Sequence, residues 1–352
     1  MQEKQNLTSK IIKYCNQLPD PCSSFLLETG TEMAYSTRLE YAKELTAFFD
    51  YLISYSPDFC EKEKRQITLA DIKLITSQDI SRYLTIYKDQ GKKERTVARK
   101  RAALSRFFTY LTANRQIEYN PVVAAVKVKI HKTDEVIHLD EKEQIQLLND
   151  IDTGDALTKN QQKYHERYRM RDYALITLLL DTGMRVSELH GIDIPDFDME
   201  ECSVIITRKG GNIQTLYFSD ETRDIINDYI EERTSIEGEF YDPNGPLFVT
   251  KKGARLSVRA IEVLVKKYAV SSIPGKGQKI SPHKMRSSFA MSYYKSERDI
   301  LALQKKLGHA SLAVVNAYAV SSDTVMKDTR NAVNDIRKNS EEQKVKKIFD
   351  EN

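Results

Sequence analysis

The stretch RDYALITLLLDTGMRVSEL, residues 171–189, joins two predicted helices through a glycine. Its first ten residues are strongly apolar and follow a helical pattern that ends near Thr182 and Gly183. Arg185 comes just after this break, and Glu188 lies three residues further along the next helix. The stretch therefore predicts an apolar helix, a glycine turn and a cation at the start of a second helix.

Two short runs typical of β-strands follow, SVIIT at 203–207 and QTLYF at 214–218. The turn-rich residues 208–212 join them, which predicts a hairpin whose basic tip carries Lys209. The polar residues 153–166 are predicted to form a surface insertion. We therefore expect a mainly α fold with a small β-sheet. Helical patterns occupy the rest of this half of the chain, at 140–151, 222–233, 258–268, 283–294, 298–307 and 322–338.

The first third of the chain contains helical patterns. Apolar residues at three- and four-residue spacing predict amphipathic helices at 34–55 and 91–115, and a capping signal at 76–79 predicts a helix at 76–87. Pro121 ends this run, because proline disfavours helix in the residue before it. Residues 122–137 have little helical periodicity and are predicted to form a linker. The sequence thus predicts a helical domain over 1–121, with an ordered core at about 22–118, and a second domain over 138–352.

Composition excludes several classes of protein. The chain has 352 residues, of which 40% are hydrophobic and 30% charged, and it contains no run of 18 apolar residues. A membrane span and a secretion signal are therefore not expected, and a cytoplasmic location is predicted. The cysteines are far apart without a C-x-x-C pair, which argues against a disulfide framework or a zinc site. They are Cys15, Cys22, Cys60 and Cys202.

Charge is informative only in its distribution. The 54 Lys and Arg residues and 51 Asp and Glu residues leave a net charge of +3. Residues 91–115, however, hold eight basic residues and one acid, a local excess of positive charge that favours binding to a phosphate backbone. A solvated helix face is the alternative explanation. The candidate DNA-binding residues are Lys92, Lys93, Arg95, Arg99, Lys100 and Arg106.

Further cations recur in the second half of the chain. His283 and Arg286 lie one helical turn apart, on the same face. Leu307-Gly308-His309 ends a predicted helix, and Tyr318 follows nine residues after the histidine. Together with Arg185 and Lys209 they suit a phosphodiester anion, because arginine binds phosphate bidentately and stays charged. A tyrosine with a pKa of about 10 needs such an electropositive pocket and a base to act as a nucleophile.

The order of these motifs resembles the tyrosine recombinase (phage-integrase-like) family. The first box of that family, T-G-x-R-x-S-E-L, matches residues 182–189, and a hairpin lysine followed by glycine matches Lys209. The later boxes match residues 283–286 and residues 307–309 with Tyr318. The resemblance covers residues 25–337. Four boxes in family order are a specific signal, whereas one would be weak.

The resemblance implies a helical core-binding domain and a catalytic domain that clamp duplex DNA. Tyr318 would attack the scissile phosphate and form a 3′-phosphotyrosyl link. Arg185 and Arg286 would hold the non-bridging oxygens and stabilise the charge of the transition state.

The other matched residues would serve the same reaction. Lys209 would be the general acid for the leaving 5′ oxygen, and His283 the base for the tyrosine. His309 would donate to the phosphate, and Glu188 would orient its neighbours. No metal or cofactor is expected, because the cationic side chains take that electrostatic role.

Three positions depart from the family pattern. Ser287 and Val320 stand where the family often has histidine, and Met285 replaces the usual leucine before the second arginine. None of these is a principal catalytic position. The departures therefore affect the fine structure of the pocket and leave the reaction class unchanged.

Each candidate also has an ordinary structural explanation when taken alone. Arg185 and Glu188 could form a surface pair, Lys209 could be a solvated turn residue, and Tyr318 is one of 19 tyrosines. The two histidines could be helix caps or core residues. Their joint occurrence in order favours the functional set. Two rival functions remain, a type IB topoisomerase and a non-catalytic DNA-binding protein on the same fold.

The resemblance also implies partners. The layout is closest to two-domain Xer-type enzymes, which resolve chromosome dimers or serve mobile elements. We expect double-stranded DNA with a specific core site, a homo-tetramer on two such sites, and possible pairing with a second recombinase or accessory protein at the nucleoid. Residues 322–338 would form a helix that docks into a neighbouring protomer, or one that folds back on its own domain.

Overall fold

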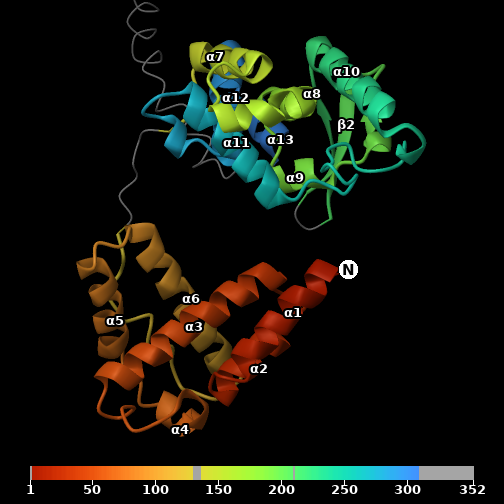
Figure 1. The fold of residues 1–352 in the computed structure, drawn as a ribbon. Helices are drawn as coiled ribbons and strands as arrows, with labels where there is room; N and C mark the ends of the chain where they lie inside the picture. Colours follow the sequence, from red (N-terminus) through yellow and green to blue (C-terminus); the bar gives the residue numbers. More distant parts are fainter. Residues whose placement is uncertain (1, 130–135, 209–210, 309–352) are drawn as a thin grey trace, which may run out of the picture. The chain divides into compact units, whose positions relative to one another are not determined.

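The computed structural model describes residues 2–129, 136–208 and 211–308. The chain divides into two compact units, Met1–Lys132 and Thr133–Asn352 (Figure 1). Helices dominate both units, and one small antiparallel sheet lies in the second. The expected mainly α fold with a small sheet is thus confirmed. Among the described residues no helix is long and apolar enough to cross a membrane.

The first unit is a helical bundle around an aromatic core. Phe25, Phe48 and Phe107 are fully buried, and the rings of Phe25 and Phe107 meet edge to face at 5.6 Å. The helices are α1 (Gln2–Cys15), α2 (Asp20–Glu28), α3 (Tyr35–Tyr55), α4 (Leu69–Ile72), α5 (Ser77–Asp89) and α6 (Glu94–Ala113), with a 3-10 turn η1 at Lys64–Gln66.

The core of the first unit is longer than the sequence predicts at both ends. Ile11 and Leu18 are buried in it, before the predicted start near residue 22. Val122 and Ala125 are buried in the same core, although both were assigned to the linker. Burial of their apolar side chains stabilises the first unit, although the segment is short and lacks the periodicity that would have predicted burial.

The second unit is built around one long helix. This helix, α8, packs against α7, α10 and α12 and contributes the fully buried Leu175 and Leu179 to the core (Figure 1). The helices of the unit are α7 (Glu141–Thr153), α8 (Lys159–Thr182), α9 (Val186–Gly191), α10 (Asp220–Glu237), α11 (Val258–Ser272), α12 (Pro282–Glu297) and α13 (Ile300–Leu307), with 3-10 turns η2 (Ile194–Asp196), η3 (Gly238–Phe240) and η4 (Gly277–Lys279).

The predicted surface insertion at 153–166 is wrong. Helix α8 already begins at Lys159, and the imidazole of His165 is buried where its Nε2 meets the Ile151 carbonyl at 2.7 Å. Leu157 is buried as well. The sequence did not predict this part of the helix, because the segment is mostly polar and one of its few inward-facing residues is a histidine.

The hairpin forms as predicted, shifted by one residue in its second strand. Strands β2 (Ser203–Thr207) and β3 (Ile213–Tyr217) are antiparallel, with Val204 opposite Leu216. A short strand β1 (Phe197–Asp198), which the sequence did not reveal, completes the order β1-β2-β3. Val204 and Leu216 are buried in the core, so the two strands are anchored to the helices of the unit.

Candidate active site

Arg185 reaches its position through the glycine turn after α8. Gly183 has φ +61°, and a Cβ atom there would collide with the ring of Phe289, so this position requires glycine. The turn makes Arg185 the N-cap of α9. Its side chain is 39% exposed, which leaves the guanidinium accessible from solvent.

Glu188 fixes this arginine from inside the unit. The Arg185 backbone N–H donates to Glu188 Oε2 at 2.7 Å, and Nη1 donates to Oε1 at 2.7 Å. The Glu188 side chain is almost fully buried. Arg185 and Glu188, which could have formed a surface pair, therefore form a pair whose acidic partner is buried. The Glu188 carboxylate orients the Arg185 guanidinium.

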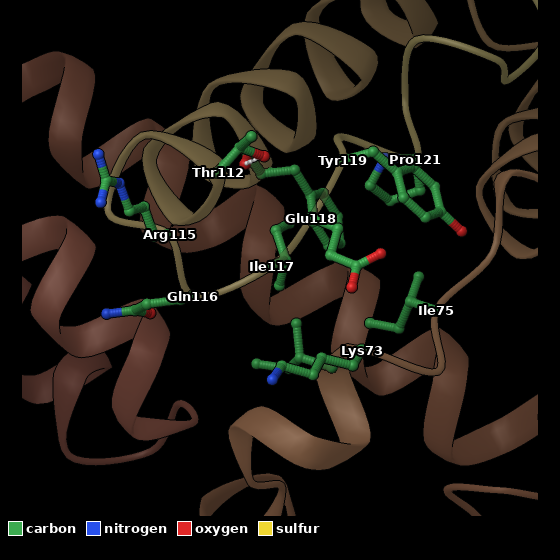
Figure 2. Close-up of a pocket in the computed structure, with 11 residues that line it drawn as sticks. Lys73, Ile75, Thr112, Arg115, Gln116, Ile117, Glu118, Tyr119 and Pro121 are labelled. Carbon is green, nitrogen blue, oxygen red and sulfur yellow. Dashed lines mark hydrogen bonds between the residues drawn. The ribbon is translucent and has the colours of Figure 1, made fainter.

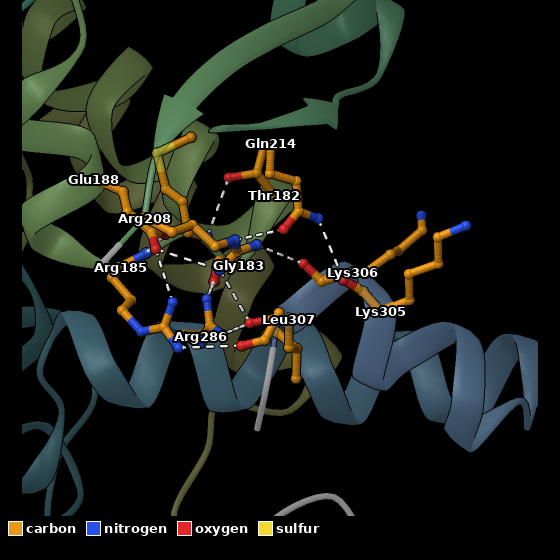
Figure 3. Close-up of polar contacts among 12 residues, drawn as sticks. Thr182, Gly183, Arg185, Glu188, Arg208, Gln214, Arg286, Lys305, Lys306 and Leu307 are labelled. Carbon is orange, nitrogen blue, oxygen red and sulfur yellow. Dashed lines mark hydrogen bonds and ion pairs between the residues drawn. The ribbon is translucent and has the colours of Figure 1, made fainter. Parts of the chain in front are cut away.

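Arg286 is held by main-chain carbonyls from two other elements. Its Nη1 donates to the Gly183 carbonyl at 2.6 Å, and Nη2 donates to the Leu307 carbonyl at the end of α13. Arg185 Nη2 in turn lies 3.4 Å from the carbonyl of Gly308. Three segments that are distant in sequence thus meet at two arginines (Figure 3).

His283 lies on α12, one turn before Arg286. The residue is exposed overall, yet partial burial of the imidazole is the largest cause that lowers its pKa from the usual 6.5. The positive charges of Lys284, Arg286 and Arg185 lower this pKa further. The ring is therefore neutral at pH 7 and can accept a proton.

A third arginine, Arg208, belongs to the cluster. Its side chain, only 6% exposed, turns inward from the end of β2. It donates to Glu188 Oε1 at 3.3 Å, to the Leu307 carbonyl at 3.1 Å and to the Lys306 carbonyl at 2.9 Å. The turn-rich run 208–212 predicted a turn position for Arg208, because nothing in the local pattern indicates that its side chain points inward.

The cluster has an excess of positive charge. Arg185 and Arg208 share one carboxylate, that of Glu188, and Arg286 donates to the carbonyl oxygens of Gly183 and Leu307. Charge in such a partly enclosed place acts more strongly on an anion than it would in bulk water. No group of three or more potential metal ligands occurs among the described residues. The geometry therefore suits a phosphate group.

Comparisons with known proteins identify the family. The model of the phage integrase family matches residues 138–324, and that of the phage integrase N-terminal SAM-like domain matches residues 25–115. The chain belongs to the phage integrase family. The resemblance drawn from the four boxes is thereby confirmed, and the protein is a tyrosine-type site-specific recombinase.

The relatives of the recombinase share most of its length. It is 30% identical over 300 residues to tyrosine recombinase XerC of Caldanaerobacter subterraneus subsp. tengcongensis, which covers 83% of this chain and 79% of the relative. It is 28% identical to tyrosine recombinase XerC of Listeria monocytogenes serotype 4b, over 80% of this chain and 94% of the relative.

A solved structure shares the fold. The XerH recombinase bound to palindromic difH substrate, in a post-cleavage complex, superposes with a TM-score of 0.65. The match covers 88% of this chain and 94% of that one, at 20% identity.

The described part of the recombinase includes only some of the predicted catalytic residues. Arg185, Glu188 and Arg286 are brought together, and His283 is close enough for both arginines to affect its pKa. Of the departures from the family pattern, Ser287 is buried, with its hydroxyl 3.2 Å from the His283 carbonyl, and Met285 is buried in the core. Four residues lie outside the described part: Lys209, His309, Tyr318 and Val320.

The basic face of α6 is less uniform than its sequence. Lys92, Lys93 and Arg95 are exposed and form no ion pair with any described residue. Arg99 instead pairs with Glu44 at 3.0 Å, and the other paired arginine of the face, Arg106, donates to Glu32 at 2.7 Å.

Lys100 does not face solvent, contrary to the prediction. Its side chain is 9% exposed, and its Nζ lies 2.5 Å from Glu44 Oε2 and 4.1 Å from the centre of the Tyr87 ring. Glu44 belongs to α3 and Tyr87 to α5, so Lys100 joins three helices of the first unit. A lysine is buried only when its charge is paired, which explains its place on the inner side of α6.

A separate pocket of about 650 Å³ lies in the first unit (Figure 2). Lys73, Arg115 and Glu118 contribute opposite charges to its wall, beside the apolar Ile75 and Tyr119. This mixture differs from the cationic cluster around Arg185. The pocket is not a candidate for phosphodiester chemistry.

Proposed function

We propose that the recombinase cleaves and rejoins double-stranded DNA at a specific core site, through a covalent 3′-phosphotyrosyl intermediate on Tyr318. The observation that carries this proposal is the arginine cluster, in which Arg185 and Arg208 share the carboxylate of Glu188 and Arg208 and Arg286 share the Leu307 carbonyl. An exposed guanidinium with spare positive charge favours a phosphate, and favours still more the extra charge of its transition state. Tyr318 follows the end of α13, whose carbonyls contact these arginines.

The proposed reaction balances without an external energy source. The Tyr318 oxygen forms a bond to the scissile phosphorus, and the bond from phosphorus to the 5′ oxygen breaks. The phenolic proton passes to His283, which is neutral at pH 7, and Lys209 protonates the leaving 5′ oxygen. A 5′-hydroxyl from another strand then attacks the phosphotyrosine and restores a phosphodiester.

Arg185 and Arg286 would bind the non-bridging oxygens, and His309 would donate a further hydrogen bond to the phosphate. Glu188 would hold Arg185 in place, as it does without DNA. No metal or cofactor takes part in this scheme.

DNA would also contact the first unit. We assign this contact to Lys92, Lys93 and Arg95, because their charges are exposed and carry no acidic partner among the described residues. Arg99 and Arg106 would contribute less, since each already pairs with a glutamate. Phosphate contacts of this kind supply affinity and orientation more than sequence recognition.

The assembly proposed is a homo-tetramer on two core sites, acting alone or with a second recombinase or accessory protein. Solved structures on the same fold include a Tn1549 transposon integrase in complex with transposon right end DNA, with a TM-score of 0.62. The proposed role is thus either resolution of chromosome dimers or integration and excision of a mobile element, on DNA of the nucleoid in the cytoplasm. Residues 322–338, proposed to link protomers, lie outside the described residues.

Mapping covalent protein–DNA adducts on genomic DNA tests the proposal. Adducts of the intact protein should concentrate at one short sequence, and the Tyr318→Phe variant should bind that sequence without forming them. A chromosomal locus or the ends of an element would then distinguish the two roles. Adducts spread over plasmids that lack the site, with relaxation of those plasmids, would favour a topoisomerase. Binding without any adduct would favour a non-catalytic protein.

A further inference from the structure

We propose that Arg208 is a positioning residue that holds the two phosphate-binding arginines in register and keeps a positive charge available to the phosphate. The inference rests on the proposed function of Arg185 and Arg286. It concerns a residue that lies outside the four sequence boxes and that does not reach the scissile group itself.

Arg208 first connects to Arg185 through a shared carboxylate. Glu188 Oε1 accepts from Arg185 Nη1 at 2.7 Å and from Arg208 Nη1 at 3.3 Å. With Arg185 alone, the buried Glu188 would form a neutral pair. With two guanidiniums on one carboxylate, one positive charge remains.

Arg208 connects to Arg286 through a shared carbonyl. The Leu307 oxygen accepts from Arg208 Nη1 at 3.1 Å and also from Arg286 Nη2. Arg286 then donates from Nη1 to the carbonyl of Gly183, two residues before Arg185. The hydrogen bonds therefore close a ring in which Arg208 is the link between the two phosphate-binding arginines (Figure 3).

The remaining donors of Arg208 tie the hairpin to α13. Nε donates to Gln214 Oε1 on β3 at 2.5 Å, and Gln214 Nε2 donates to the Lys305 carbonyl at 3.2 Å. Nη2 donates to the Lys306 carbonyl at 2.9 Å. A Cβ atom on Gly308 would lie 2.5 Å from Arg208 Cζ, so the backbone at the end of α13 passes directly over the guanidinium.

These contacts also cover the carbonyl groups at the C-terminal end of α13. The last carbonyls of a helix carry partial negative charge, which repels an anion. In α13 the carbonyls of Lys306 and Leu307 are covered by Arg208, and Leu307 is covered by Arg286 as well. Without Arg208, a phosphate near Arg185 would meet both a neutral ion pair and exposed helix carbonyls.

This role predicts a particular chemical signature. If Arg208 acts through Arg185 and Arg286, its loss affects the charge on the non-bridging oxygens of the scissile phosphate. A methylphosphonate, in which a methyl group replaces one non-bridging oxygen, is neutral and needs less of that positive charge. A 5′-bridging phosphorothiolate instead relieves only the need for a general acid, because a thiolate leaves without protonation.

The experiment compares single-turnover adduct formation on three duplexes that carry the mapped site. They have a normal phosphate, a methylphosphonate or a 5′-bridging phosphorothiolate at the scissile position. Arg208→Met should slow cleavage of the phosphate by about 10- to 100-fold. This fall in rate is no larger than the one expected when a donor that touches the reacting group is lost. On the methylphosphonate the loss should shrink to less than about threefold. The phosphorothiolate should not restore the rate.

Folding defects do not obscure this result, because both rates come from one preparation and their ratio is independent of the fraction folded. Arg208→Lys should lose an intermediate amount on the phosphate, since it keeps the charge with only one donor group. Arg233→Met is the matched control. Arg233 is equally buried in the same unit and donates to the Pro246 and Leu247 carbonyls, outside the ring. This control should cleave each duplex at the unsubstituted protein's rate.

Equal losses on phosphate and methylphosphonate would overturn the inference. Rescue of Arg208→Met by the phosphorothiolate alone would also overturn it, because Arg208 would then act on the general acid. Arg185→Ala separates this outcome from failure of the proposed function. If methylphosphonate rescues Arg185→Ala and not Arg208→Met, only the inference is wrong. If it rescues neither, the phosphate role of Arg185 is contradicted and the inference falls with it.

Discussion

Two cationic regions of the recombinase use arginine and lysine in opposite ways. On α6, Arg99 and Arg106 pair with glutamates from other parts of the first unit, and Lys100 is buried against Glu44. In the cluster of the second unit, Arg185 and Arg208 share the carboxylate of Glu188, and main-chain carbonyls accept hydrogen bonds from Arg185, Arg208 and Arg286. A carbonyl orients a guanidinium without cancelling its charge.

The difference explains why a basic run in a sequence is a poor guide to available charge. Residues 91–115 hold eight cations within 25 positions, and the structure pairs three of them with three acids, Glu32, Glu40 and Glu44. The cluster draws its arginines from three separate segments, none of which is a basic run. Its positive charge appears only when the fold brings them together.

The largest effect should come from the cluster. Arg286→Ala removes a guanidinium that the Gly183 and Leu307 carbonyls hold beside Arg185, so cleavage should fall by roughly 100-fold or more. Affinity for the duplex should change little, because most phosphate contacts lie elsewhere. Gel shifts and adduct kinetics on the mapped site measure the two quantities separately. Near-normal cleavage by Arg286→Ala would remove it from the pocket.

The next effect tests the other side of the comparison, on stability. Lys100→Met leaves Glu44 buried with only the exposed Arg99 as a partner, which should lower the free energy of unfolding by about 3 kcal/mol. Arg106→Met breaks an exposed pair and should cost less than about 1 kcal/mol. Urea denaturation of the full chain measures both. If the two variants were equally stable, Lys100 would not be a structural residue.

The pH dependence of cleavage should reflect the partial burial of His283 first and the charges of its neighbouring cations second. Because the pKa of His283 lies below its usual 6.5, the neutral base is present at pH 7 and is lost as the pH falls through that pKa. The single-turnover rate should therefore decline about tenfold per pH unit on the acid side, with a midpoint below 6.5. In His283→Gln this acid limb should be missing. A midpoint above 7 would contradict a His283 pKa that burial and the neighbouring cations lower.

The smallest effect concerns DNA affinity. Arg95→Ala should weaken binding a few-fold and reduce the slope of log K against log salt by about 0.9, the value for one lost phosphate contact. Arg106→Ala should leave this slope unchanged, because Glu32 already neutralises the guanidinium. Fluorescence anisotropy over a salt series measures both slopes. Equal changes of the two slopes would mean that the ion pair between Arg106 and Glu32 opens when the protein binds DNA.

The sequence predicted those features that follow from local pattern. Two runs typical of β-strands placed the strands of the hairpin within one residue, and the glycine turn placed Arg185 next to its buried partner Glu188. Inward-facing polar side chains were missed because their partners come from distant segments. Arg208 meets the end of α13, about 100 residues later, and His165 meets Ile151 across the turn after α7.

The same reason explains the error at Lys100. Its neighbours in sequence are solvent-facing cations, while the residue that decides its burial, Glu44, lies 56 positions earlier. Helical spacing does place Lys100 near the face of Val97 and Leu104, both buried. That spacing could have predicted a buried Lys100. The charge of the side chain favoured the opposite prediction, an exposed residue.

Identification of the residue that becomes attached to DNA tests the central claim most directly. The covalent complex formed on the mapped site is digested with trypsin and nuclease, and the modified peptide is sequenced by mass spectrometry. The account predicts a single phosphonucleotide adduct on Tyr318, joined through the 3′ phosphate, and none in Tyr318→Phe. Attachment to any of the other 18 tyrosines, to a serine, or through a 5′ phosphate would contradict it.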